Sequence, residues 1–286
     1  MDQELLDLVA AVGRQAALAA GAVMRLNYLK PHHVTLKGAI DPVTETDLQA
    51  QETIISLIRH YFPDHGFLAE EERVGEDVGE GAKRGGTGVS PVDLSPPPPP
   101  TPFRWIIDPL DGTVNFAHGF PMFCASIAFE AEGRLEYGVV CDPLRDELFE
   151  ARRGGGAFLN GRLIRVSKTE PLDRALLATG FPYDIRERLP ETLARLGRML
   201  GVVQGVRRAG SAALDLCYVA CGRVDGFWEE NLKPWDTAAG LLIIEEAGGR
   251  ITTFSGRAYD IYAPNILASN GLLHLQIIEE LKVKEL

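Results

Sequence analysis

Two aspartates stand three residues apart at the end of an apolar run in the segment WIIDPLDGTVNFAHG, Trp105 to Gly119. Pro109 biases Asp108 towards an extended backbone, so this residue is expected to be the last of a strand, and the next Asp-Gly pair favours a tight turn. The carboxylates of Asp108 and Asp111 can then face one point. Taken alone, an acidic turn with Asp-Gly is more often ordinary loop chemistry than a functional site.

Three other acidic segments could join these two aspartates. Glu70 and Glu71 end a second predicted strand, in HGFLAEEE. Asp47 lies in DPVTETD, and Asp236 opens a predicted helix. Each has a structural alternative, because Asp47 could cap a helix, Asp236 could complement a helix N-terminus, and the glutamates could form a solvated strand end. Converged carboxylates would instead need cations among them, and hard oxygen ligands favour Mg²⁺ or Mn²⁺ in a two-ion site for phosphoryl transfer.

Composition restricts the class of protein. With 286 residues and 45% hydrophobic content, the chain can form one large α/β domain or two small ones. The net charge of -11 argues against a general binder of nucleic acid or of an anionic membrane surface. No stretch approaches the roughly 20 apolar residues of a membrane span, and no basic leader opens the chain. We therefore expect a cytoplasmic protein whose four cysteines are reduced, buried thiols.

The spacing of apolar residues predicts the elements that position these acids. Helices are expected over residues 4–28 and 46–62, ended by Pro31 and Pro63. The runs MFCASIAFE, RLEYGVVCD, ELFEARR and AFLNGRLIRVS, the last with an Asn-Gly turn, predict an antiparallel meander. Further helices are expected in SAALDLCYVACG, in PWDTAAGLLIIEEAGG and over 272–281, with strands in VDGFWE, GRITTFS and NILASNG. Such alternation indicates a layered α/β or α+β domain.

Residues 73–103 interrupt this pattern, since thirteen of the thirty-one are Gly or Pro and five consecutive prolines lie among them. The segment has too little apolar surface to form a domain. The acids before residue 73 need partners from the chain after residue 103, so we expect an insertion, flexible and near the rim of the site, within a single domain over residues 1–286.

The four acidic motifs together resemble the inositol monophosphatase family of metal-dependent, lithium-sensitive sugar phosphatases. WIIDPLDGTVNFAHG and WDTAAGLLIIEEAGG match its two signature motifs, DPVTETD and FLAEEE support them, and the resemblance covers nearly the whole chain. It implies an α/β (α+β) sandwich of alternating helix and sheet layers, as in fructose-1,6-bisphosphatase. It also implies a homodimer that hydrolyses a small phosphorylated polyol, with myo-inositol monophosphate the leading substrate.

Carried onto this sequence, the resemblance implies a site for two to three Mg²⁺ ions, with Mn²⁺ as a possible substitute. The first ion would be held by Glu70, Asp108 and the Leu110 carbonyl. The second would be held by Asp108, Asp111 and Asp236. Asp108 would bridge the two, and a third, weaker ion would lie near Glu70.

The resemblance also assigns the residues around the phosphate and the sugar. Asp47 and Thr113 would orient or deprotonate the attacking water, and Gly112 and Thr113 would offer backbone amides to the phosphate. The residues expected at the substrate are Asp111, Gly112, Thr113, Gly210, Ser211, Ala212 and Glu229. Ser211 is an equally good helix N-cap. Lys37 matches a basic residue in a loop over the site, and His118 is expected to pack or cap.

The implied reaction is direct displacement, in which a water of lowered pKa attacks phosphorus in line with the leaving alkoxide. The sequence offers no Cys or Ser nucleophile with a base beside it. Other substrates stay possible, because these motifs position the metal ions and the phosphate, whereas other residues recognise the leaving group. The alternatives are fructose 1,6-bisphosphate, histidinol phosphate and nucleotide phosphates. A non-catalytic regulatory or RNA-linked homologue is the alternative from another class, although the acidic charge speaks against nucleic acid.

Overall fold

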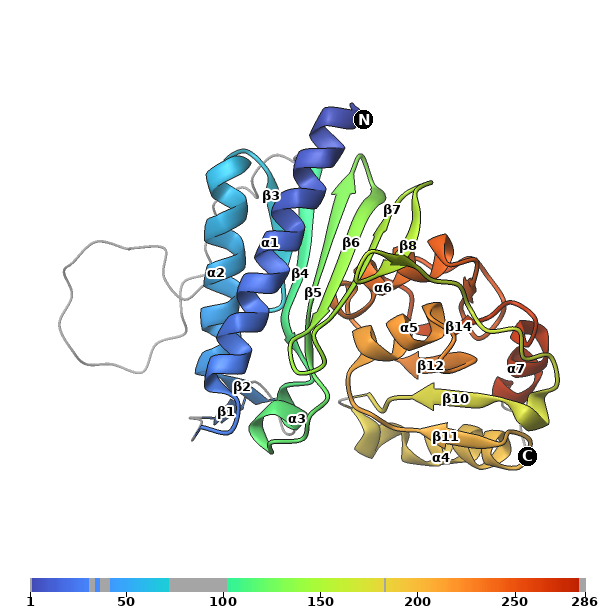
Figure 1. Ribbon diagram of the computed structural model, residues 1–286. Coiled ribbons are helices and arrows are strands. Elements are labelled where there is room, and N and C mark those ends of the chain that lie inside the picture. Colours follow the sequence, from blue (N-terminus) through green and yellow to red (C-terminus); the bar gives the residue numbers. More distant parts are fainter. Residues whose placement is uncertain (1, 31–33, 37–41, 72–101, 183, 283–286) are drawn as a thin grey trace, which may run out of the picture.

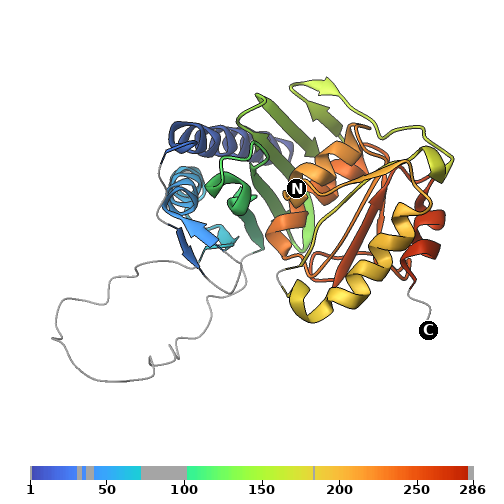
Figure 2. The ribbon, with the colours of Figure 1, turned by 90° about the horizontal axis from the view of Figure 1, so that it is seen from below.

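The computed structural model describes residues 2–30, 34–36, 42–71, 102–182 and 184–282. Its layers alternate between helix and sheet (Figures 1 and 2). Helices α1 (Gln3–Asn27) and α2 (Glu45–Tyr61) cover one face of a large sheet, and α5 (Ala212–Ala220) and α6 (Pro234–Glu246) cover the other. A smaller sheet comes next, with α4 (Ile185–Leu200) and α7 (His274–Leu281) on its outer side. The expected sandwich of alternating layers is confirmed.

The large sheet has the strand order β3-β4-β5-β6-β7-β8-β9. β3 runs parallel to β4, and every later pair is antiparallel, so the predicted meander is confirmed. At its far edge Asn160 and Gly161 both have positive φ, as an Asn-Gly hairpin requires. The strands are β3 (Gly66–Ala69), β4 (Phe103–Asp111), β5 (Cys124–Ala131), β6 (Arg134–Asp142), β7 (Glu147–Arg152), β8 (Gly156–Leu159) and β9 (Arg162–Leu163).

The helices of the first layer form where the apolar pattern predicts them. α1 ends at Asn27, ahead of the position expected from Pro31, and α2 begins with Thr44 as its N-cap. By length and composition alone α1 is also apolar enough to cross a membrane, so the expectation that no stretch is apolar enough was wrong. In the structure its apolar face packs against α2, β5 and β6, which is what a helix of the protein core does. A small hairpin of β1 (Val34–Leu36) and β2 (Pro42–Thr44) precedes α2.

The small sheet has the order β11-β10-β12-β14-β13. Three of its strands were predicted, whereas β10, β11 and helix α4 were not. α4 carries apolar residues at helical spacing, Leu189, Leu193, Leu196 and Leu200, but Pro190 lies inside it and only Thr192 and Met199 are buried. The strands are β10 (Leu176–Thr179), β11 (Gly205–Arg207), β12 (Gly226–Glu230), β13 (Arg250–Thr252) and β14 (Asn265–Ser269), preceded by a 3₁₀ turn at Leu172–Arg174.

His274, at the start of α7, is buried between the hydroxyls of Thr252 and Ser269, each 2.8 Å from a ring nitrogen. Thr252 donates its own proton to the Thr253 carbonyl, so it accepts from Nε2 of the ring. Nδ1 is then left to accept from Ser269, which requires a neutral imidazole. Burial lowers the pKa of His274 from 6.5 to about 4, in agreement with this assignment.

Two further expectations concern the inserted segment and the thiols. The predicted insertion over 73–103 lies outside the described residues except at 102 and 103, and Phe103 already begins β4. Its flexibility and the single-domain boundary at 1–286 stay predictions. All four cysteines are free thiols, and three of them are buried as expected, whereas Cys221 is partly exposed.

Candidate active site

The predicted acids come together where the large sheet meets the inner helices. Asp108 and Asp111 lie on β4, Glu70 follows β3 directly, and Asp236 is in the first turn of α6. A pocket opens beside them and is lined by both halves of the chain. Its lining includes Asp111, Gly112, Thr113, Gly180, Phe181, Arg208, Gly210, Ser211, Ala212, Asp215, Glu229 and Asp236.

β4 does not end at Asp108, as expected from Pro109, but continues to Asp111 with a shift of register against β5. The shift places one extra residue on β4, and such bulges re-aim side chains. Asp108 Oδ1 accepts a hydrogen bond from Leu110 N at 3.0 Å, which folds the bulge around this carboxylate. Gly112 comes next with φ of 97°, and a Cβ there would lie 2.8 Å from the Met122 carbonyl oxygen. Only glycine fits this turn.

Asp111 joins the two halves of the chain. Its Oδ2 accepts hydrogen bonds from Ser211 Oγ at 2.6 Å and from Ala213 N at 2.8 Å, in the first turn of α5. Ser211 is also the N-cap of α5, with its Oγ 3.4 Å from Leu214 N. Ser211 is therefore a helix N-cap, as its structural alternative predicted, and the cap fixes the position of α5 against Asp111. Its contact with the substrate stays a prediction.

The pair of Asp47 and Thr113 is formed directly. Thr113, the first residue of the short helix α3 (Thr113–Ala117), has its Oγ1 2.8 Å from Asp47 Oδ1 and 3.0 Å from the Leu110 carbonyl oxygen. The other oxygen of Asp47 accepts from the backbone and hydroxyl of Thr44 in a capping box. Asp47 is fully buried, so it serves both as the predicted helix cap and as a partner of the site.

The glutamates after β3 are not a solvated strand end. Gln51 of α2 bonds both the carbonyl and the amide of Glu71, at 2.9 and 3.1 Å, and Glu71 is buried. The amide of Glu70 donates to the Ile107 carbonyl. These backbone contacts fix Glu70 beside Asp108 on the neighbouring strand.

The electrostatics of the acids indicate a site that needs positive charge. Burial, followed by the charges of Glu70, Asp111 and Asp236, raises the pKa of Asp108 well above its usual value. Burial and then Asp111 raise the pKa of Asp236, although Lys233 N donates to this carboxylate at 2.6 Å. Asp236 thus complements its helix N-terminus and also belongs to the acidic group. Buried carboxylates that repel one another are stabilised by a cation.

The residues fit a divalent cation by donor chemistry and by charge. Four carboxylates and the Leu110 carbonyl are hard oxygen ligands of the kind that Mg²⁺ prefers. The side chains are not, however, arranged as a complete set of metal ligands. Among the described residues, no three His, Cys, Asp or Glu side chains lie in a metal-binding arrangement.

On the sugar side, Gly210, Ser211, Ala212 and Glu229 all line the pocket, as expected. Burial raises the pKa of Glu229 to about 8. His118 is the C-cap residue of α3 and lies outside the lining, in agreement with a capping role. Lys37 lies outside the described residues.

Sequence reasoning missed Gly180, Arg208 and Asp215, which line the same pocket. Asp215 had a detectable signal, because it follows Ser211 by four residues and so lies on the same face of α5. Gly180 and Arg208 carry no such pattern. They reach the pocket through β10 and β11, the two strands that were not predicted.

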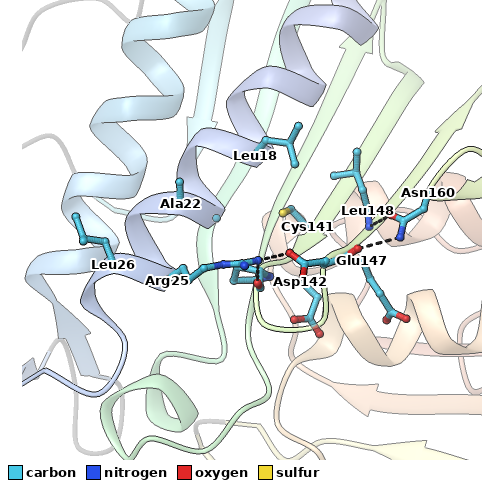
Figure 3. A pocket seen from close by; sticks show the side chains of 12 residues that line it. Leu18, Ala22, Arg25, Leu26, Cys141, Asp142, Glu147, Leu148 and Asn160 are labelled. Carbon is cyan, nitrogen blue, oxygen red and sulfur yellow. Dashed lines mark hydrogen bonds and ion pairs between the residues drawn. The ribbon is translucent and has the colours of Figure 1, made fainter.

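A larger cavity of about 710 Å³ lies between α1 and the turn from β6 to β7 (Figure 3). Its polar groups already have protein partners: Asp142 accepts from Leu144 N and from Arg145, and Arg25 pairs with Asp146. We therefore place the chemistry at the smaller, acidic pocket.

Comparison with known proteins agrees with this assignment. The model of the inositol monophosphatase family matches residues 5–285. The chain belongs to the inositol monophosphatase family. The family is metal-dependent.

Two relatives of known sequence are each 42% identical to this chain over 271 residues. One is an "Inositol-1-monophosphatase" from Synechocystis sp., matched over 94% of this chain and 87% of the relative. The other is a "Nus factor SuhB" from Pseudomonas aeruginosa, matched over 94% and 92%. Among solved structures, the extragenic suppressor protein suhB from Bartonella henselae has a TM-score of 0.84 at 40% identity, over 96% and 98% of the chains. An inositol monophosphatase from Anabaena has a TM-score of 0.79 at 39% identity, over 96% of each chain.

Proposed function

We propose that this protein is a Mg²⁺-dependent phosphomonoester hydrolase that releases phosphate from a small phosphorylated polyol, with myo-inositol monophosphate the leading substrate. The observation that carries the proposal is the convergence of buried, mutually repelling carboxylates with the Asp47 and Thr113 pair at one pocket. The 42% identity to a protein named inositol-1-monophosphatase supports the substrate class.

The metal site would be formed by Glu70, Asp108, the Leu110 carbonyl, Asp111 and Asp236, holding two to three Mg²⁺ ions or Mn²⁺ in their place. Bound there, such ions lower the pKa of water and stabilise negative charge on the leaving oxygen. The chain itself contributes rigidity, because Leu110 N fixes Asp108, and Ser211 with Ala213 fixes Asp111.

Thr113 and Asp47 would handle the proton of the attacking water. The hydroxyl of Thr113 can pass its proton to Asp47, 2.8 Å away, while its oxygen receives one from the water. Thr44 holds the second oxygen of Asp47 and so keeps the first directed at Thr113. The amides of Gly112 and Thr113, at the start of α3, would donate to phosphate oxygens.

The test is a phosphate-release assay of purified protein over a panel of phosphomonoesters, with and without Mg²⁺ and with lithium as an inhibitor. We expect turnover that requires Mg²⁺, falls with lithium and is fastest on inositol monophosphates. Fastest turnover of fructose 1,6-bisphosphate or histidinol phosphate would replace the leading substrate within the same chemistry. Absence of turnover on every ester would refute the hydrolase.

The relatives named "Nus factor SuhB" favour a second candidate, a regulatory protein that keeps the fold. A non-catalytic regulatory protein would show no Mg²⁺-dependent turnover, whereas the hydrolase must show it. The phosphate-release assay therefore distinguishes the two candidates. The cytoplasmic location and the homodimer stay predictions from the sequence, and light scattering tests the homodimer.

A further inference from the structure

The side chain of Asn115, in the middle of α3, lies against carbonyl groups from both halves of the chain. Its Nδ2 donates to the carbonyl oxygens of Met122 at 2.7 Å, of Ala209 at 2.9 Å and of Gly210 at 3.2 Å. All three partners are carbonyl oxygens, which only accept, so the atom that faces them must be the amide nitrogen. This nitrogen has two protons for three acceptors, so two of the acceptors share one proton. One amide group thus joins α3 both to the start of β5 and to the segment before α5.

The backbone before α5 is shaped for this close approach. Gly210 has φ of 89°, and a Cβ there would lie 3.0 Å from Nδ2 and 3.2 Å from Oδ1 of Asn115. Both distances are shorter than an ordinary contact of a Cβ atom, and glycine is the residue that adopts this backbone conformation without strain. Within its own turn, the backbone carbonyl of Asn115 accepts from Phe120 N at 2.8 Å. The amide is therefore fixed at its base and lies flat against the backbone of Gly210.

The segment that Asn115 contacts leads directly into the turn that binds Asp111. Ser211 follows Gly210, and its Oγ donates to Asp111 Oδ2 at 2.6 Å. Ala213 N donates to the same oxygen at 2.8 Å. The first turn of α5 is therefore held at two points by one short stretch of chain, because Asn115 lies only four residues after Asp111. Contact at two points fixes the orientation of this turn as well as its distance from β4.

We propose that Asn115 is a positioning residue for the metal site. By binding the carbonyls before α5, it keeps Ser211 and Ala213 where they hold the carboxylate of Asp111 in the orientation that binds Mg²⁺. The proposal rests on the proposed metal-dependent function, in which Asp111 is a ligand. Asn115 is not among the residues that line the pocket, so it acts through Asp111 and not by contact with the substrate.

Two substitutions separate the hydrogen bonds of Asn115 from its packing. Asn115→Asp keeps the shape of the side chain but removes the donor, whereas Asn115→Ala removes both. Both variants should need roughly 5- to 30-fold more Mg²⁺ than wild type for half-maximal thermal stabilisation. The negative charge of an aspartate would by itself attract Mg²⁺, so the expected rise is opposite to any effect of charge. Turnover should show the same displaced Mg²⁺ dependence and recover as Mg²⁺ is raised.

Asn27 provides the matched control. It ends α1 and donates to Gln49, and neither residue lines the pocket. Asn27→Asp and Asn27→Ala therefore make the same chemical changes at a distance from the site. Both should leave the half-saturating Mg²⁺ concentration within about twofold of wild type.

Amide hydrogen exchange in EDTA tests the positioning without metal and without turnover. The amides of Ala213 and Leu214, in the first turn of α5, should exchange roughly tenfold faster in Asn115→Ala than in wild type. Amides within β5 and β6 should exchange at the wild-type rate, because these central strands of the large sheet keep their own hydrogen bonds.

Three results would overturn the positioning role. A wild-type Mg²⁺ requirement in both variants would show that Asp111 is held without Asn115. A wild-type requirement in Asn115→Asp alone would assign the residue to packing. Loss of the folded state in both variants, or faster exchange throughout the large sheet, would make Asn115 a general structural residue. Failure of the hydrolase is a separate outcome: if Mg²⁺ stabilises wild type but no ester is hydrolysed, the hydrolase fails and the positioning role stands.

Discussion

The substitution Asp111→Asn separates two roles of this side chain, because its carboxylate is a proposed metal ligand and also a hydrogen-bond acceptor that holds the fold together. Its Oδ2 accepts from Ser211 Oγ and Ala213 N and so ties β4 to α5. An asparagine side chain has the same shape, and its amide oxygen can accept both bonds. The amide nitrogen then takes the place of the other oxygen, and a nitrogen with two protons is no ligand for Mg²⁺.

The expected effect on stability has opposite signs with and without metal. Without Mg²⁺, removing one of several mutually repelling buried charges should leave the melting temperature unchanged or raise it, because burial alone already raises the pKa of Asp111. With Mg²⁺ at 100 times its Kd, wild type should gain about 2.7 kcal/mol. For a chain of 286 residues that is roughly 4 to 5 °C, and the variant should lose most of it.

The assay is thermal unfolding in EDTA and across a Mg²⁺ titration, together with phosphate release. Turnover of the variant should fall by about 10³-fold or more, since loss of the ion removes several kcal/mol of transition-state stabilisation. Asp146→Asn is the matched control: this aspartate is exposed, lies outside the acidic pocket and has φ of 53°, which Asn tolerates. Wild-type Mg²⁺ stabilisation and turnover in Asp111→Asn would refute the assigned ligand set.

Three further variants test other parts of the structure. Thr113→Val removes the hydroxyl that contacts Asp47 and should lower kcat roughly 10²- to 10⁴-fold with little change in KM; a wild-type kcat would exclude the proton path. Gly180→Ala should displace the carboxylate of Glu229 and raise KM for inositol phosphate while leaving the melting temperature nearly unchanged, and an unchanged KM would contradict this packing. His274 has a folded pKa of about 4 against 6.5 unfolded, so its neutral form stabilises the fold fully above pH 6.5. That contribution, about 3 kcal/mol, should be lost as the pH falls from 6.5 to 4. Urea unfolding of His274→Gln should show a flatter pH dependence than wild type, and parallel curves would refute the assignment.

Much of the fold follows from local sequence patterns. Apolar periodicity located α1, α2 and the meander because each element buries one face and so repeats at its own period. The same reasoning missed α4, where Pro190 interrupts leucines that otherwise follow the helical period, and it missed β10 and β11, which are too short to show alternation. The end of β4 was misplaced because a register shift depends on the neighbouring strand, which no local pattern records.

The sequence by itself determined which residues could form the site, because its four acidic motifs together resemble those of one metal-dependent family, whereas each motif alone also had a structural explanation. Only the tertiary structure decided how they are held. Asp47 meets Thr113 across 66 residues, and Asp111 meets Ser211 across 100. The place of Asp215 and Glu229 at one pocket was likewise hidden, because they come from α5 and β12, which meet only in the fold. Residue type sets the chemistry that is available, and packing between distant segments sets which groups share a ligand.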